Sequence, residues 1–164
     1  MPENIQGQLS FFQRERGILT DFQVSEPAST FGSINPPIQV AVPPGFTPIT
    51  SVSITINSQT DRIWLNGTLS LTADFAAVGV VTVTLQLLRE TTIIYQTTKT
   101  ISSPQTVPAT VSETVHLEHI DVTAVTGDIP VTTTYTLRAQ TDMAIVSASG
   151  PITLTAAQLE RNPA

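Results

Sequence analysis

A short run in the second half of the chain, His-Leu-Glu-His-Ile-Asp, groups side chains of the types that bind metal ions. His116 and His119 are three positions apart, with Glu118 and Asp121 beside them. A metal site needs several such ligands to converge on one point. In a strand, positions i and i+3 point to opposite faces. The four side chains can therefore converge only if the strand is interrupted, and the pattern favours no metal site.

Other catalytic patterns are absent from the sequence. The 13 acidic residues are scattered without a local motif, although glycoside hydrolysis needs two of them across a cleft. No serine lies in a Gly-X-Ser-X-Gly elbow, and the isolated glycines form no phosphate-binding loop. The chain has no cysteine, which excludes thiol nucleophiles and disulfides. We therefore predict a protein that is not an enzyme, with no catalytic, cofactor-binding or metal-binding residues.

The composition predicts a neutral surface covered by Thr, Ser, Gln and Asn. Charged residues make up 12% of the 164 residues, against a usual proportion of about 25%. Seven Lys and Arg and a net charge of −6 exclude a basic surface for nucleic acid. We also expect no membrane insertion, because no stretch approaches about 20 apolar residues, and no secretory signal peptide, because the first residues lack its pattern. Little charge repulsion would oppose contact between copies of such a chain.

Apolar and polar residues alternate along most of the chain, as they do in half-buried β-strands. In the stretch 51–57, Val52, Ile54 and Ile56 share one face. Further strands are predicted at residues 63–73, 80–88, 93–98, 111–122, 131–139 and 152–159. Short strands separated by turn residues predict an all-β fold, which we interpret as an antiparallel jelly-roll sandwich.

The alternation is irregular in the stretch 111–122. Val115 and Leu117 have one parity, whereas Ile120 and Val122 have the other. A β-bulge near His119, or a strand that switches sheets there, would explain the change.

A second irregularity is the pair Asn66-Gly67 inside the predicted strand 63–73. This dipeptide is typical of a tight hairpin turn, so the strand is either continuous or split in two. The triplet Asn66-Gly67-Thr68 also matches the N-glycosylation acceptor pattern, which we interpret as a chance match within a strand.

The first forty residues differ from the rest of the chain. They contain four of the six phenylalanines and end in Asn35-Pro36-Pro37, a stiff run that is typical of a spacer. We predict an extended N-terminal arm with a Pro-rich spacer over residues 1–40 and a jelly-roll domain over residues 41–164. The arm adds a strand to its own domain, docks on a neighbouring copy by strand addition, or lacks fixed structure. In the docking alternative, the candidate assembly residues are Leu9, Phe11, Phe12, Ile18, Leu19 and Phe22.

The order of several segments resembles a known family. They are Trp-Leu-Asn-Gly, the strand 80–88 with its return, His-Leu-Glu-His-Ile-Asp-Val, Thr-Tyr-Thr-Leu-Arg-Ala, and the closing Ile-Thr-Leu-Thr-Ala-Ala-Gln-Leu. Over roughly residues 48–160, this order resembles the tumour-necrosis-factor/C1q-type jelly roll. It is similar more narrowly to the jelly-roll proteins of the bacterial endospore surface. These comprise the C-terminal domain of the collagen-like exosporium glycoprotein, exosporium basal-layer proteins and spore-appendage proteins.

The resemblance implies a structural protein that forms homotrimers on the spore surface. The chain departs from the collagen-like members because it has no Gly-X-Y repeat. We therefore expect a self-assembling subunit of a spore-surface layer or appendage fibre, linked to neighbouring copies by its arm. Its partners would be copies of itself and other spore-surface proteins. It would be made in the mother-cell cytoplasm without a signal peptide.

Two other functions remain open from the sequence. One is a phage or viral decoration or fibre-head protein, which shares the low charge. The other is a receptor-type module that binds carbohydrate or protein, which would need exposed aromatic side chains. Trp64, Tyr95 and Tyr135 are the aromatic residues available, and we expect them in the core or in an interface.

Overall fold

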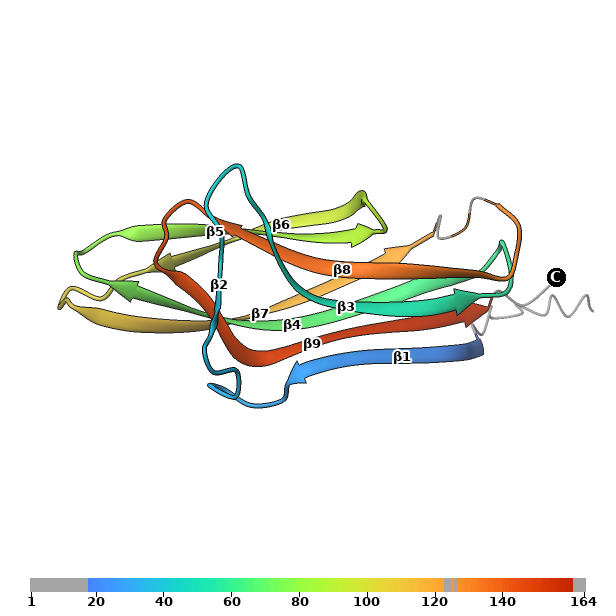
Figure 1. Ribbon diagram of the computed structural model, residues 1–164, viewed down its shortest axis with the longest axis horizontal. Coiled ribbons are helices and arrows are strands. Elements are labelled where there is room, and N and C mark those ends of the chain that lie inside the picture. Colours follow the sequence, from blue (N-terminus) through green and yellow to red (C-terminus); the bar gives the residue numbers. More distant parts are fainter. Residues whose placement is uncertain (1–17, 123–124, 126, 161–164) are drawn as a thin grey trace, which may run out of the picture.

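The alternating segments form strands in the computed structural model, of which we describe residues 18–122, 125 and 127–160 (Figure 1). Each predicted strand is confirmed, and the described residues contain no helix. The strands are β1 (Ile18–Ala28), β2 (Ile38–Gln39), β3 (Thr47–Ile56), β4 (Arg62–Phe75), β5 (Val80–Arg89), β6 (Thr92–Ser102), β7 (Ala109–Asp121), β8 (Val131–Thr141) and β9 (Val146–Glu160).

The strands form two antiparallel sheets that face each other (Figure 1). The first sheet has the order β1-β9-β4-β7, and the short strand β2 also pairs with β9. The second sheet has the order β3-β8-β5-β6. The described chain is therefore a two-sheet β-sandwich, which confirms the predicted all-β class.

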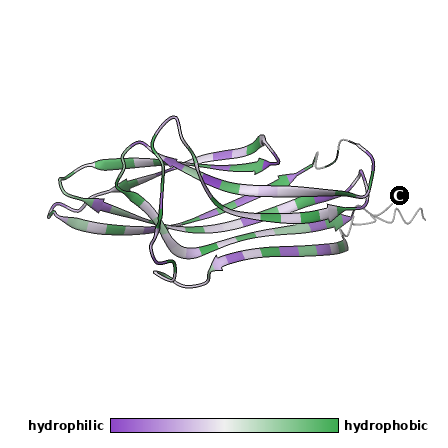
Figure 2. Ribbon diagram, viewed as in Figure 1, coloured by the Kyte–Doolittle hydropathy of each residue, from purple (hydrophilic) through white to green (hydrophobic). Residues whose placement is uncertain are grey.

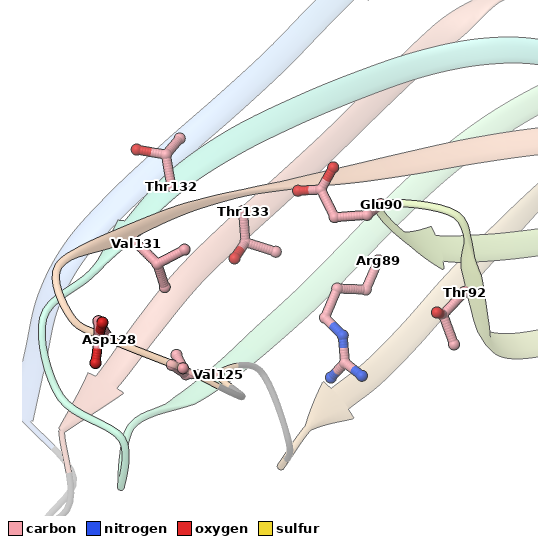
Figure 3. A pocket seen from close by; sticks show the side chains of 9 residues that line it. Arg89, Glu90, Thr92, Val125, Asp128, Val131, Thr132 and Thr133 are labelled. Atoms are coloured by element: carbon pink, nitrogen blue, oxygen red, sulfur yellow. The ribbon is translucent and has the colours of Figure 1, made fainter.

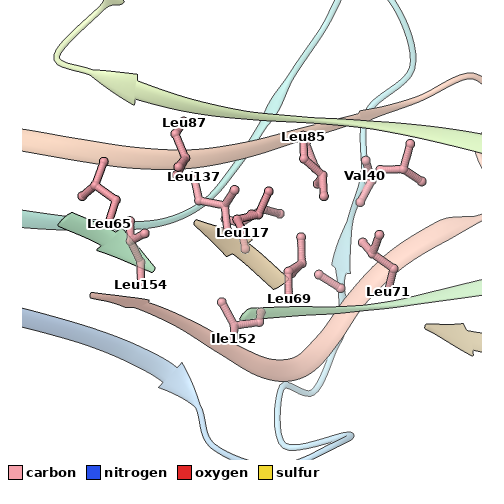
Figure 4. Close-up of a cluster of buried hydrophobic side chains, with 14 of the residues drawn as sticks. Val40, Leu65, Leu69, Leu71, Leu85, Leu87, Leu117, Leu137, Ile152 and Leu154 are labelled. Carbon is pink, nitrogen blue, oxygen red and sulfur yellow. The ribbon is translucent and has the colours of Figure 1, made fainter. Parts of the chain in front are cut away.

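The core lies between the two sheets, where the inward side chains of both meet (Figure 4). Hydrophobic and hydrophilic residues alternate along the strands (Figure 2), because successive side chains point to opposite faces. Burial of each large apolar side chain stabilises the fold by about 1.5–3 kcal/mol. The largest fully buried side chains are Ile54, Ile56, Ile63, Leu65, Leu69, Leu71, Leu85, Leu87, Ile101, Leu117, Tyr135 and Leu137.

Of the two irregularities, the continuous alternative for the strand 63–73 is confirmed, and the bulge or sheet switch expected near His119 is wrong. Strand β4 continues through Asn66-Gly67 without a turn. Strand β7 pairs with β4 without a register shift, from Ile63 opposite Asp121 to Phe75 opposite Ala109. The parity changes in β7 because its apolar residues lie on both faces. Leu117 points into the core, whereas Ile120 lies exposed on the outer face.

Residues 18–40 of the expected arm contribute β1 and β2 to the first sheet of their own chain. Both strands pair with β9, which corresponds to the first of the three alternatives for this segment. Among the inward residues of β1 is Ser25, whose hydroxyl shares a 2.7 Å hydrogen bond with that of Thr50. The candidate residues Leu9, Phe11 and Phe12 lie outside the described residues, and the domain boundary near residue 40 stays a prediction.

Gly150 in β9 fixes the end of β1 against its own sheet. Its φ is +93°, in a region that L side chains rarely adopt. A Cβ added there would lie 2.5 Å from the Thr30 carbonyl oxygen and 2.9 Å from the Ala28 Cβ. Only glycine therefore lets the chain after β1 approach β9 this closely.

We expect Gly150→Ala to lower the free energy of unfolding by about 1–3 kcal/mol, because the new methyl group meets a backbone oxygen and the φ is strained. Urea denaturation followed by circular dichroism measures the change. Gly79→Ala is the matched control, since a Cβ at Gly79 meets no atom within 4 Å. Equal urea midpoints for the two variants would contradict the close approach of Thr30 and Ala28 to Gly150.

Candidate assembly surface

An apolar row crosses the whole outer face of the first sheet. Phe22 in β1 is paired with Ala157 in β9, Ala157 with Trp64 in β4, and Trp64 with Ile120 in β7. Side chains that lie directly opposite on neighbouring strands are in contact range. Phe22 is 54% exposed, Trp64 39% and Ile120 47%. We call these four residues the apolar row.

A groove of about 420 Å³ lies along the part of this row that β1, β9 and β4 contribute. It is lined by Leu19, Phe22, Trp64, Asn66, Thr155, Ala157 and Leu159. More exposed apolar side chains lie on the two edge strands and just beyond them, with Val24 in β1 and Val122 after β7. The outer face therefore carries several exposed apolar side chains close together, an arrangement that is typical of interaction sites when it forms a contiguous patch.

One polar atom of the row is bonded within the chain. The indole Nε1 of Trp64 donates to Glu118 Oε1 at 3.0 Å, so this group needs no outside partner. Further along the same two strands, Ser70 and Thr114 share a hydrogen bond of 2.6 Å, as do Thr72 and Ser112 at 3.2 Å. The face thus divides into an apolar part and a part covered by hydroxyl pairs.

The two histidines point to opposite sides of the first sheet. His116 lies on the outer face and shares a hydrogen bond with Thr68, Nδ1 to Oγ1, at 3.2 Å. His119 points inward, and its ring centroid lies 5.5 Å from that of Tyr95. Within the part of the chain that the structure describes, no three His, Cys, Asp or Glu side chains are grouped for a metal ion.

A buried polar cluster closes the interior at one end of the sandwich. Asp121 is 3% exposed and accepts from Arg89 Nη1 at 2.9 Å and 3.0 Å through its two oxygens. The Tyr135 hydroxyl donates to Asp121 Oδ2 at 3.0 Å. Burial, followed by the Asp121 charge and hydrogen bond, raises the pKa of Tyr135 well above its ordinary value. The cluster is a satisfied structural ion pair that joins the two sheets.

A second cavity, of about 510 Å³, opens beside this cluster (Figure 3). Its lining residues are Arg89, Glu90, Thr92, Val125, Gly127, Asp128, Val131, Thr132 and Thr133. The one cationic side chain in this lining, Arg89, already binds Asp121. An anion in this cavity would therefore compete with an internal ion pair.

The sequence pointed to part of this surface. Leu19 and Phe22, both candidate assembly residues, lie on the exposed face of β1, but they are joined by residues of β4, β7 and β9 that were not candidates. The outward position of Ile120 could have been predicted from the sequence, because Ile120 has the opposite parity to the buried Leu117 in the same strand. The position of Trp64 beside Phe22 had no such signal, since it depends on strand order.

No protein-family model and no curated protein matches the sequence. Among solved structures, the chain is similar to dimeric latent PorU from Porphyromonas gingivalis, with a TM-score of 0.45 and 12% sequence identity. The match covers 87% of this chain and spans 13% of the PorU chain. A likeness this distant carries no argument about function. Across the described residues, no helix has the length and apolar character needed to cross a membrane.

Proposed function

We propose that the chain is a structural subunit that assembles with copies of itself through the outer face of its first sheet. The apolar row is the observation that carries this proposal. Phe22, Trp64 and Ile120 are each roughly half exposed, so covering them would contribute about 0.8–1.5 kcal/mol each. With 12% charged residues in the chain, little charge repulsion opposes the contact.

The fold that we propose is a jelly roll. The strand orders β1-β9-β4-β7 and β3-β8-β5-β6 support it, because from β2 onward each strand lies in the other sheet from the strand before it, except in the β5–β6 hairpin. Together with the resemblance of residues 48–160 to endospore-surface jelly rolls, this supports a homotrimer in a spore-surface layer or appendage fibre. Other spore-surface proteins would then be its neighbours.

The arm would link one unit to the next. Residues 1–17 precede β1, whose Leu19 lines the groove on the first sheet, so they join the described chain near the proposed contact face. Seventeen extended residues span up to about 56 Å, which is enough to reach an adjacent copy. Leu9, Phe11 and Phe12 supply the apolar side chains for docking there.

Deletion of residues 2–17 tests the arm. We expect the shortened chain to fold and to form discrete oligomers, because the apolar row is intact, but to form no fibres. Negative-stain electron microscopy of the full and shortened chains, purified in parallel, measures the difference. Ordered fibres from the shortened chain would contradict the linking role.

A second candidate function, a carbohydrate-binding module, has one observation in its favour. The groove places the Trp64 ring beside the amide of Asn66 and the hydroxyl of Thr155, and sugars bind to an aromatic face flanked by such polar groups. A glycan array with the wild-type protein separates the candidates. Saturable binding that Trp64→Ala abolishes would favour the carbohydrate module, whereas assembly without glycan binding favours the structural subunit.

A further inference from the structure

A second exposed apolar surface lies where the β4–β5, β6–β7 and β8–β9 connections meet, at one end of the sandwich. Phe75 at the end of β4 pairs with Ala109 at the start of β7. The amide of Asp74 donates to the carbonyl oxygen of Ile145, in the β8–β9 connection, at 3.0 Å. We call this the loop end. Its exposed large apolar side chains are Val78, Val80 and Met143.

A pocket of about 460 Å³ opens at the loop end. The side chains of Phe75, Pro108 and Ala109 give it apolar walls. Its one charged lining residue is Asp74, whose Oδ1 already accepts a hydrogen bond from Thr110 Oγ1 at 2.6 Å. The remaining lining residue is the exposed Ala76. This loop-end pocket therefore suits an apolar side chain.

The charges around the pocket are all negative. Residues 76–79, 103–108 and 142–145, which form the three connections, contain one charged residue, Asp142. Its Oδ1 accepts from the amide of Thr82 at 2.9 Å. An apolar segment followed by cations would complement this surface. The stretch 11–16, Phe-Phe-Gln-Arg-Glu-Arg, has that pattern and carries two of the seven Lys and Arg of the chain.

This stretch joins the chain at the opposite end of the sandwich (Figure 1). Leu19 pairs with Leu159, which pairs with Arg62 at the start of β4, whereas the pocket lies at Phe75, where β4 ends. The 14 residues of β4 span about 43 Å. Phe11 is eight positions before Leu19 and reaches about 29 Å from it at most. The aromatic pair therefore cannot enter the pocket of its own chain.

A linking arm needs a receptor site that it cannot reach on its own chain. A tethered segment meets a site within its reach at a millimolar effective concentration, so it would close on its own subunit. The groove beside Leu19 is within reach, whereas the loop-end pocket is not. We propose that Phe11 and Phe12 of one copy dock into the loop-end pocket of the next copy. This inference rests on the linking role of the arm proposed above.

The contact makes the assembly directional. It joins two different surfaces of identical chains, and a contact of this kind repeats into a filament unless its rotation closes a ring. The joined sites lie at opposite ends of the sandwich (Figure 1). Successive subunits therefore point in the same direction, and the fibre has two unlike ends.

Disulfide trapping between full-length chains tests the docking, because the chain has no cysteine of its own. One variant carries Gln13→Cys, which leaves the aromatic pair intact, and a second carries Ala76→Cys in the pocket lining. The two are purified separately, mixed and oxidised, and mass spectrometry identifies the linked peptides. The matched control replaces the second variant with Ser51→Cys, an exposed position on the other sheet.

We expect the Ala76→Cys mixture to give more than about tenfold the cross-linked product of the Ser51→Cys mixture, because docking holds the two thiols at a millimolar effective concentration. Equal yields would overturn the proposal. A third mixture contains Asn66→Cys, in the groove on the first sheet. Cross-linking there in place of Ala76→Cys would mean that the groove holds the arm, and would overturn the proposal as well.

The same mixtures in the background of Phe22→Asp with Ile120→Asp separate this docking from the proposed face contact. We expect the Ala76→Cys cross-link to persist, because the pocket lies away from the apolar row. Wild-type assembly without that cross-link would refute the docking alone. A cross-link between chains whose outer faces do not associate would support the docking and refute the face contact.

Discussion

Replacing Arg89 with alanine is expected to lower the free energy of unfolding by about 3–5 kcal/mol, because one partner of a buried ion pair is lost. Arg89 on the second sheet binds both oxygens of Asp121 on the first. Without the guanidinium, the buried carboxylate would keep the Tyr135 hydrogen bond but would lose both hydrogen bonds of its ion pair with Arg89. The loss is comparable to the whole stability of many domains, about 5–15 kcal/mol.

Urea denaturation of the wild type and Arg89→Ala measures this effect. Lys99→Ala is the matched control, because Lys99 pairs with Glu113 at 3.1 Å with both side chains substantially exposed. Exposed pairs contribute about 0–1 kcal/mol. If the two variants lost similar amounts of unfolding free energy, Arg89 would stabilise the protein no more than an exposed ion pair does.

Charges placed in the apolar row are expected to abolish self-assembly. In the double variant Phe22→Asp and Ile120→Asp, two carboxylates stand at the two edges of the proposed contact face. Because each side chain is about half exposed, losing the two apolar contacts costs about 0.8–1.5 kcal/mol each and weakens association by about 10–10²-fold. Desolvation of the new charges adds to this. The fold should persist, because both wild-type side chains are about half exposed.

Size-exclusion chromatography with light scattering measures the oligomeric state over a range of concentrations, and circular dichroism verifies the fold. The control carries the same substitution on the other sheet, as Ser51→Asp with Thr98→Asp, two exposed positions on its edge strands β3 and β6. We expect this control to assemble like the wild type. A wild type that stays monomeric at high concentration, or a row variant that assembles normally, would refute the assembly surface.

Together these two experiments separate folding from assembly. The ion pair lies inside one chain, so Arg89→Ala should act on stability at any concentration. The apolar row lies on the outside, so its effect should depend on concentration and leave the stability of the single chain nearly unchanged.

The strands of this protein were predictable because their signal is local. Alternation with a period of two requires only neighbours in sequence, and it correctly placed Val52, Ile54 and Ile56 in the core. The composition likewise predicted a surface with few charged residues. By itself, then, the sequence determined the all-β class, the inward face of the strands with regular alternation, and a surface with few charges.

Tertiary structure alone decided which strands lie side by side. That strand order creates both the apolar row and the Arg89–Asp121 ion pair. Phe22 and Trp64 are 42 positions apart in sequence and become near neighbours because β9 pairs with both β1 and β4. Arg89 and Asp121 meet across the sandwich for the same kind of reason. Alternation gave a wrong prediction where an apolar residue faces outward. Ile120 was expected to follow a bulge, but β7 has none, and Ile120 belongs to the apolar row. Pairing energies are non-local, so no window of sequence contains them.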